Sequence, residues 1–188
     1  MGSKFNYKRL NNRRFRKTEE AILEAFFVEK KILSIRVLTR RAKISRSTLY
    51  RHHENTYEVV PDYEEYILKK YCNLMRGLMR RKNIKLRTLY YQMLIFIFKN
   101  KNVLKVILLT GDKCLIEKMV QKLELRIVEI YRLPKNHEKM LRIYRKEIAG
   151  LIEEWIENGM NCEEMDSVLM SIMDLTKTMR QRLRILLD

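Results

Sequence analysis

Residues 34–53 (SIRVLTRRAKISRSTLYRHH) contain the residue types that recognise double-stranded DNA. A helix that reads the major groove needs small or polar residues near its start, an apolar residue on its back, and phosphate-binding groups at its rim. Here Ser47 and Thr48 are small and polar, and Leu49 is the apolar anchor. We therefore predict a recognition helix that begins at about Ser45, whose hydroxyl would cap it by accepting from the Thr48 amide.

The candidate DNA contacts are polar and basic side chains on this helix and on the segment before it. They are Arg36, Arg40, Lys43, Ser45, Arg46, Ser47, Thr48, Tyr50, Arg51 and His52. The charge of the chain is concentrated in the same region. Residues 1–55 hold 15 basic and 5 acidic side chains, a net of +10, whereas residues 56–188 hold 25 and 18, a net of +7. Such a distribution suits a polyanionic partner, either nucleic acid or an anionic membrane surface.

Three helices are expected to position these side chains. The first begins at Thr18 with two acidic residues behind it, after a basic arm formed by residues 1–17. The second is capped by Ser34 and turns Leu38 inward, and the third is the recognition helix. This arrangement predicts a helix-turn-helix.

The remainder of the chain has helical periodicity throughout. A fourth helix runs from about Asn55 or Pro61 to Arg81, and Pro61 predicts either a kink or a helix that begins there. Residues 86–98 are apolar on nearly every face, which predicts a central helix. Further helices are expected after Asp112, at about 137–158, where Gly159 stops the helix, and at about 163–187.

The chain has only five Gly and two Pro, and this scarcity favours long helices over strands. We predict an all-α fold of about nine helices, in which residues 1–60 form a three-helix DNA-binding domain and residues 61–188 form a larger helical bundle. Cys72, Cys114 and Cys162 have no metal-ligand or disulfide spacing, and we expect them to be small core residues of a cytoplasmic protein.

The N-terminal third of the chain resembles the tetracycline-repressor (TetR) family of bacterial transcription regulators. The likeness covers about residues 15–70 without a gap. The residues that carry it are Thr18, Ile22, Phe26, Ser34, Leu38, Ala42, Ile44, Ser45, Arg46, Thr48, Leu49 and Tyr50. Three positions depart from the family pattern. Lys43 replaces a glycine in the turn, so a left-handed backbone there would be mildly strained. His53 replaces an aromatic residue, and we expect it to be buried or half-buried in place of that residue. Thr56 replaces a lysine that would contact a phosphate.

This resemblance implies a homodimeric regulator, a repressor that binds a near-palindromic DNA operator and is released by an effector in the C-terminal domain. It also implies that residues 61–188 hold a small-molecule pocket and the dimer contact. Met and aromatic residues suit an adaptable pocket, although an ordinary core uses them too. The candidates are Tyr71, Met75, Tyr90, Met93, Phe96 and Met119. The dimer candidates lie on two helices with apolar stripes and are Gly150, Ile152, Trp155, Ile172, Met179 and Leu183.

Enzymatic functions find no support in the sequence. There is no glycine-rich phosphate loop, no HExxH or GxSxG motif and no Cys/His cluster, so we expect no catalysis, cofactor or metal. The longest apolar run, at residues 89–98, is about half of a membrane span. Two alternatives remain. One is an activator of the same fold regulated by a protein partner, and the other is a basic peripheral protein that binds RNA or a membrane surface.

Overall fold

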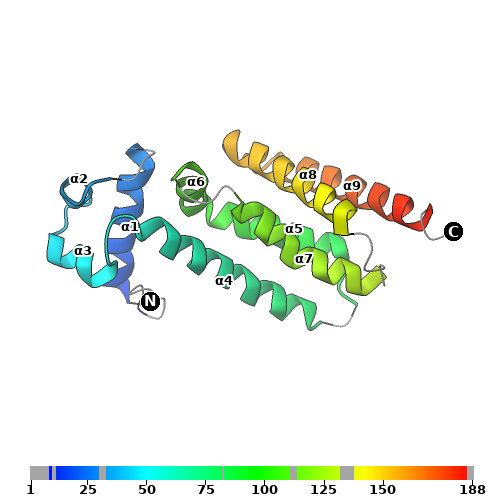
Figure 1. Cartoon of the computed structure of the whole chain (residues 1–188), viewed down its shortest axis with the longest axis horizontal. Helices are drawn as coiled ribbons and strands as arrows, with labels where there is room; N and C mark the ends of the chain where they lie inside the picture. Colours follow the sequence, from blue (N-terminus) through cyan, green and yellow to red (C-terminus); the bar gives the residue numbers. More distant parts are fainter. Residues whose placement is uncertain are drawn as a thin grey trace. The chain divides into compact units, whose positions relative to one another are not determined.

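The computed structural model describes residues 9, 12–29, 33–81, 83–110, 114–131 and 138–185. In these ranges the chain forms nine α-helices and no strand (Figure 1). The prediction of an all-α fold with about nine helices is therefore confirmed. Helix α6 (Lys101–Thr110) falls in a segment for which we predicted no separate element.

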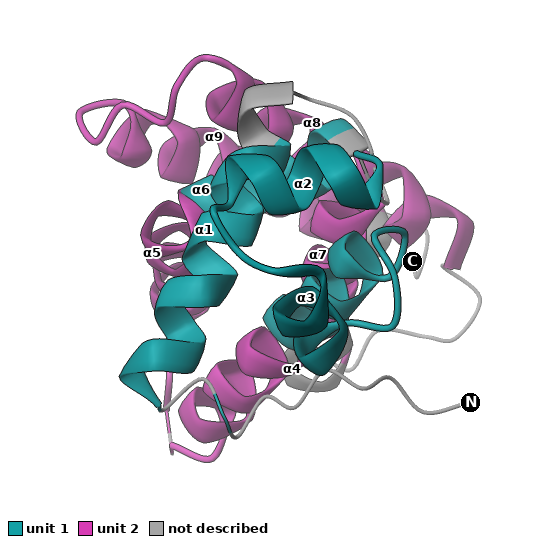
Figure 2. Ribbon diagram, turned by 90° about the vertical axis from the view of Figure 1, so that its left-hand side faces the viewer, with its two compact units in different colours: residues 1–68, 102–113 teal, residues 69–101, 114–188 magenta. Residues whose placement is uncertain are grey.

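The chain divides into two compact units (Figure 2). Unit 1 comprises residues 1–68 and 102–113, and unit 2 comprises residues 69–101 and 114–188. Unit 1 extends past residue 60, the predicted boundary, because it includes the first part of α4 (Val59–Met79) and nearly all of α6.

Unit 1 begins with α1 (Arg13–Glu29), followed by α2 (Ile35–Arg41) and α3 (Arg46–His52). Helix α1 starts five residues before Thr18 because Asn12 caps it. The Asn12 side-chain oxygen accepts from the amides of Arg14 and Phe15 at 2.9 and 3.3 Å. Residues 13–17 are therefore helical, which corrects the prediction of a basic arm over residues 1–17. Residues 1–8, 10 and 11 of that arm lie outside the described residues.

The core of unit 1 is formed by one apolar stripe from each helix. Ile22 and Phe26 on α1, Leu38 on α2 and Leu49 on α3 are fully buried. Helix α1 packs against α2, and α2 packs against α3. Each such side chain contributes about 1.5–3 kcal/mol when it leaves water, so the predicted anchors Leu38 and Leu49 hold the helix-turn-helix together.

Pro61 lies in the first turn of α4, where a missing backbone N–H costs nothing. This outcome agrees with the prediction of a helix that begins near Pro61. The amide of Asp62 donates to the carbonyl of Glu58 at 2.9 Å, so regular helical bonding resumes directly after the proline.

Unit 2 contains α5 (Leu86–Lys99), α7 (Leu115–Tyr131), α8 (Glu138–Glu157), α9 (Met165–Ile185) and the second part of α4. Helix α8 packs against α7 and α9, and α9 also packs against α5. Seven of the fourteen residues of α5 are buried, as expected for a central helix. Arg145 on α8 donates to both carboxylate oxygens of Glu124 on α7 at 2.7 and 3.0 Å, which ties these two helices together.

Helix α8 ends where the sequence predicts, because Gly159 adopts a left-handed backbone with φ +97°. Met160 follows with φ 57°, and Trp155 donates its indole N–H to the carbonyl of Asn161 at 3.0 Å. The predicted cap at Asp112 lies outside the described residues, as does the side chain of Leu183.

Candidate nucleic-acid interface

The turn between α2 and α3 is a helix C-cap with a left-handed residue. Lys43 has φ 52°, and its amide donates to the carbonyl of Arg40 at 3.3 Å. The next amide, that of Ile44, reaches the carbonyl of Thr39 at 3.0 Å. These two bonds are the Schellman pattern, in which glycine usually occupies the left-handed position. Lys43 therefore has the left-handed backbone at which the sequence predicts mild strain.

Helix α3 begins as predicted. Ser45 has an extended backbone, and its hydroxyl accepts from the amide of Thr48 at 3.0 Å. The same hydroxyl lies 2.8 Å from that of Ser47 and 2.9 Å from that of Thr48. Arg51 donates to the Thr48 hydroxyl at 3.1 Å, so one chain of hydrogen bonds orders the polar face of the helix.

Most of the candidate contacts are exposed and lie on α2, the turn and α3. Residues 35–52 contain six basic side chains and no acidic one. Tyr50 is a large aromatic residue with 45% of its surface exposed, although it lies only one position after the fully buried Leu49. The exposed candidates are Arg36, Arg40, Lys43, Ser45, Arg46, Ser47, Tyr50 and Arg51, while Thr48 is half-buried. This face offers cations, hydroxyls and one aromatic ring, which are groups that bind phosphates and base edges.

His52 differs from the other nine candidates because its side chain is only 8% exposed. Its Nδ1 hydrogen-bonds to Oε1 of Glu19 on α1, and its ring stacks on Phe15 with centroids 4.0 Å apart. We correct the prediction accordingly: at most the other ring nitrogen, Nε2, remains for a DNA contact.

Glu19 is the centre of a buried polar cluster, defined here as Glu19, His52, His53, Asp62 and Tyr63. Oε2 of Glu19 accepts from the Tyr63 hydroxyl at 2.6 Å and lies 3.1 Å from Nε2 of His53. Nδ1 of His53 lies 2.7 Å from Oδ2 of Asp62. All five side chains are nearly or fully buried. The cluster therefore joins α1 to the end of α3 and the start of α4.

Electrostatics in this cluster favour the charged forms of Glu19 and His53. Burial alone raises the pKa of Glu19, but hydrogen bonds from His52, His53 and Tyr63 outweigh it and lower the pKa to about 2. Burial lowers the pKa of His53, yet its bonds to Asp62 and Glu19 leave that pKa raised above the ordinary 6.5. A protonated His53 donates from both ring nitrogens, one to each carboxylate. His53 is thus buried as expected, in a charged role that an aromatic residue does not have.

The loop that leads into α4 presents Tyr57, an exposed aromatic residue that is not among the predicted DNA contacts. Thr56 is 4% exposed, whereas Tyr57 beside it is 68% exposed. The Asn55 side chain accepts from the amides of Tyr57 and Glu58 at 2.8 and 3.0 Å and so fixes this turn. The only sequence signal for Tyr57 is its place one residue after Thr56, the position at which the family pattern has a phosphate-contacting lysine.

The six pocket candidates are buried in unit 2 and belong to its core. Tyr71 and Phe96 contact each other with ring centroids 5.5 Å apart. The hydroxyl of Tyr71 is fully buried and has no hydrogen-bond partner among the described residues. Such an orphan marks a place where a water or a ligand atom would be favourable. Met75, Met93 and Met119 fill the same core.

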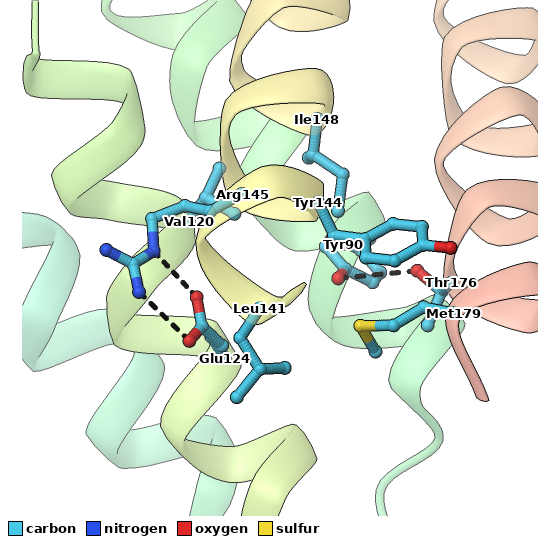
Figure 3. A pocket seen from close by; sticks show the side chains of 9 residues that line it. All are labelled: Tyr90, Val120, Glu124, Leu141, Tyr144, Arg145, Ile148, Thr176 and Met179. Atoms are coloured by element: carbon cyan, nitrogen blue, oxygen red, sulfur yellow. Dashed lines mark hydrogen bonds and ion pairs between the residues drawn. The ribbon is translucent and has the colours of Figure 1, made fainter. Parts of the chain in front are cut away.

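A small cavity opens between α5, α7, α8 and α9 (Figure 3). Its volume is about 10 Å³, which is room for about one water molecule. Of the six candidates only Tyr90 lines it, opposite the Glu124–Arg145 pair. The Thr176 hydroxyl lies 3.5 Å from the Tyr90 hydroxyl at one side of the cavity.

The dimer candidates are mostly internal to unit 2, which corrects that prediction. A side chain that is already buried within its own chain has no surface left to contact a second copy. Gly150 is exposed, and the side chain of Leu183 is not described. Large apolar side chains that are exposed on the same two helices are Ile143 (49%) and Met170 (53%). The candidates that are buried instead are Ile152, Trp155, Ile172 and Met179.

The cysteines, the metal-binding side chains and the apolar helices were also the subject of predictions. Cys114 and Cys162 are exposed and Cys72 is half-buried, so the expectation of core cysteines is wrong. Among the described residues, no group of His, Cys, Asp or Glu side chains is arranged to hold a metal ion. Within the same ranges, no helix has the length and apolar character needed to cross a membrane.

No protein-family model, curated protein or solved structure matches the chain.

Proposed function

We propose that this protein binds double-stranded DNA with sequence preference through α3. The observation that carries the proposal is the contrast between one buried apolar side chain of this helix and its exposed polar ones. Leu49 is fully buried, while Arg46, Ser47 and Tyr50 are exposed, directly after a capped N-terminus. A short helix supported in this way offers its first turns to the major groove, with basic side chains at the rim to fix its register on the phosphates.

The charge of the surrounding surface supports the same function. Six basic side chains and no acidic one lie within residues 35–52. Each phosphate that such a side chain neutralises releases counterions, so affinity for any duplex falls as salt rises. Sequence preference then comes from the polar side chains near the start of α3.

We further propose that the protein is a TetR-like transcription regulator of the bacterial cytoplasm. In that role it is a homodimeric repressor, and two copies of α3 lie about one DNA turn apart, roughly 34–36 Å, on a near-palindromic operator. An effector would lower DNA affinity by binding the DNA-incompetent state of unit 2 more tightly. The cavity beside Tyr90 is far below the roughly 300–1,000 Å³ of ordinary ligand sites, so such an effector must separate the helices that line it.

Selection from a random duplex library tests DNA recognition directly. The wild-type chain is expected to enrich one near-palindromic site, with a preference of at least about 10³ over random duplex at physiological salt. Arg46→Ala and Tyr50→Ala should each remove most of this preference. Arg87→Ala is the matched control, since Arg87 is an exposed arginine on α5 in unit 2. Absence of any enriched site would refute the proposal.

Further binding and transcription measurements on the same purified protein distinguish the proposal from the two alternative functions. If duplex DNA is bound without preference while RNA or anionic vesicles are bound more tightly, a basic peripheral protein is the better description. If an operator is found and binding to it raises transcription only with a protein partner, the activator of the same fold is supported. The homodimeric repressor instead predicts that operator binding alone reduces transcription in a purified system.

A further inference from the structure

An open pocket of about 510 Å³ lies between the start of α1 and the end of α3. Both helices belong to unit 1. On one side the lining comes from the first two turns of α1 and from residues just before that helix. On the other side it comes from Thr48, Arg51 and His52 of α3. The lining residues are Arg9, Asn12, Arg14, Phe15, Thr18, Thr48, Arg51 and His52.

The lining is strongly cationic. It contains three arginines, and none of the eight lining residues is acidic. Thr48 accepts from Arg51 at 3.1 Å, which holds that guanidinium at the rim. Guanidinium groups bind phosphate oxygens with two parallel hydrogen bonds, and hydroxyls complete the coordination of the remaining oxygens. The residue types of this pocket therefore suit a phosphate group.

His52 places a second, independent polar group at the pocket. Its side chain is almost wholly buried, its ring lies against Phe15, and Glu19 engages its Nδ1. Because Glu19 is an acceptor, Nδ1 carries a proton, and Nε2 is the remaining polar atom of a ring that lines the pocket. An anion beside Nε2 favours the imidazolium, which then donates to it. A carboxylate behind a histidine fixes the ring in the same way at metal sites.

We propose that this pocket binds a single phosphate group, held by Arg14, Arg51 and Nε2 of His52. In the complex with DNA the group is a backbone phosphate at the edge of the major groove read by α3. Thr48 and Arg51 belong both to the pocket and to α3, so the two sites are continuous. The DNA source rests on the proposed function, whereas phosphate binding by the pocket does not.

Glu19 gains a positioning role from this arrangement. The buried carboxylate holds the His52 ring at the pocket and at the same time accepts from Tyr63 on α4. The buried polar cluster therefore connects the pocket to the contact between α1, α3 and α4.

The first experiment locates the phosphate on DNA. A set of duplexes, each with one neutral methylphosphonate in place of a backbone phosphate, is bound by wild-type protein and by Arg14→Ala. Wild-type affinity should fall about tenfold at one position per half-site, and the fall at that position should be several-fold smaller for Arg14→Ala. The salt dependence of Arg14→Ala should lose about 0.9 of its slope per copy of the chain. Arg13→Ala, the exposed neighbour on α1 that does not line the pocket, is the matched control and should retain the sensitivity.

The second experiment uses inorganic phosphate without DNA, at constant ionic strength. The Nε2 nitrogen resonance of His52 should move with phosphate in the wild-type chain and in Arg13→Ala, and several-fold less in Arg14→Ala. A phosphate-dependent resonance without a sensitive DNA position would assign the pocket to free phosphate and overturn the DNA source. Loss of affinity that is equal at every methylphosphonate position, with a stationary His52 resonance, would overturn the pocket altogether. If no duplex is bound, the proposed function fails, and the resonance still decides the phosphate site.

Discussion

Oε2 of Glu19 and Nε2 of His53 lie 3.1 Å apart, and their hydrogen bond joins α1 to the residue that ends α3. The same oxygen accepts from Tyr63 on α4 at 2.6 Å, and the other carboxylate oxygen is bonded to His52. The buried carboxylate of Glu19 thus links α1 both to the end of α3 and to α4. Buried charges cost free energy unless they are paired. The contact between Glu19 and His53 is therefore favourable only while His53 keeps its proton.

The stability of unit 1 should depend on pH in two directions. The pKa of His53 is raised above 6.5 in the fold, so its stabilisation is complete below pH 6.5 and is lost as pH rises through the raised value. The pKa of Glu19 is lowered from 4.5 to about 2, so its stabilisation is complete above pH 4.5 and is lost as pH falls toward 2. We expect the free energy of unfolding to be highest between pH 4.5 and 6.5, as measured by urea denaturation. A flat profile above pH 6.5 would contradict a charged His53.

Replacing Glu19 with Gln should strongly destabilise the protein. The change leaves His53 with one carboxylate in place of two and gives His52 a weaker acceptor. Breaking a buried ion pair from one side costs about 3–5 kcal/mol, a large part of the stability of a typical domain. Urea denaturation would measure the loss of free energy of unfolding, or hydrogen exchange would show α3 opening if the variant no longer unfolds cooperatively.

Glu20→Gln is the matched control for this variant. Glu20 is the next residue on α1 and is exposed, with Arg16 at 3.6 Å. An exposed pair of this kind contributes about 0–1 kcal/mol, so the control should unfold almost like the wild-type chain. Equal losses for the two variants would show that the cluster does not stabilise unit 1.

The sequence predicted the parts of the fold that depend on local chemistry. The cap at Ser45, the buried anchor Leu49 and the stop at Gly159 each follow from a residue type at a position in a helix. The buried cluster did not follow, because Glu19 lies 33 and 34 residues before its histidine partners. An acidic pair at the start of a helix is indistinguishable from a solvated face until the partners are placed.

The start of α1 and the dimer candidates show a second limit of sequence reasoning. Asn12 precedes a run of basic residues without apolar periodicity, so its cap was hidden and Arg14 was assigned to an arm. A helix with apolar residues on two faces can pack one face within its own chain and the other against a second copy. The sequence does not show which of the two faces is covered by a neighbouring helix of the same chain. Trp155 and Ile152 were predicted to contact a second copy, yet both are buried in unit 2.

Replacing Lys43 with Gly should stabilise the protein and weaken DNA binding. A left-handed backbone at a residue with a Cβ costs roughly 1–2 kcal/mol, which glycine avoids, so we expect a gain of about 1 kcal/mol in the free energy of unfolding. Lys43 is also a candidate phosphate contact, and its loss should reduce the salt slope of DNA binding by about 0.9 for each copy of the chain. In Lys43→Ala the charge is lost but the strain stays. That variant should match Lys43→Gly in DNA binding and lack its gain in stability.

The exposed apolar residues of α8 and α9 allow a test of the proposed homodimer. Ile143 and Met170 each expose about half of their surface, and a homodimer that used α8 and α9 as its contact would cover them. Replacing either with Glu would bury an unpaired charge at such a contact, and we expect dimer dissociation to increase by at least about tenfold in sedimentation experiments. Leu109→Glu is the control, since Leu109 is 49% exposed on α6 in unit 1. Operator affinity should fall with dimer affinity, because a dimer that binds two half-sites loses half of its contacts on dissociation. If the dimer withstands both Glu variants, other residues of unit 2 must form the contact.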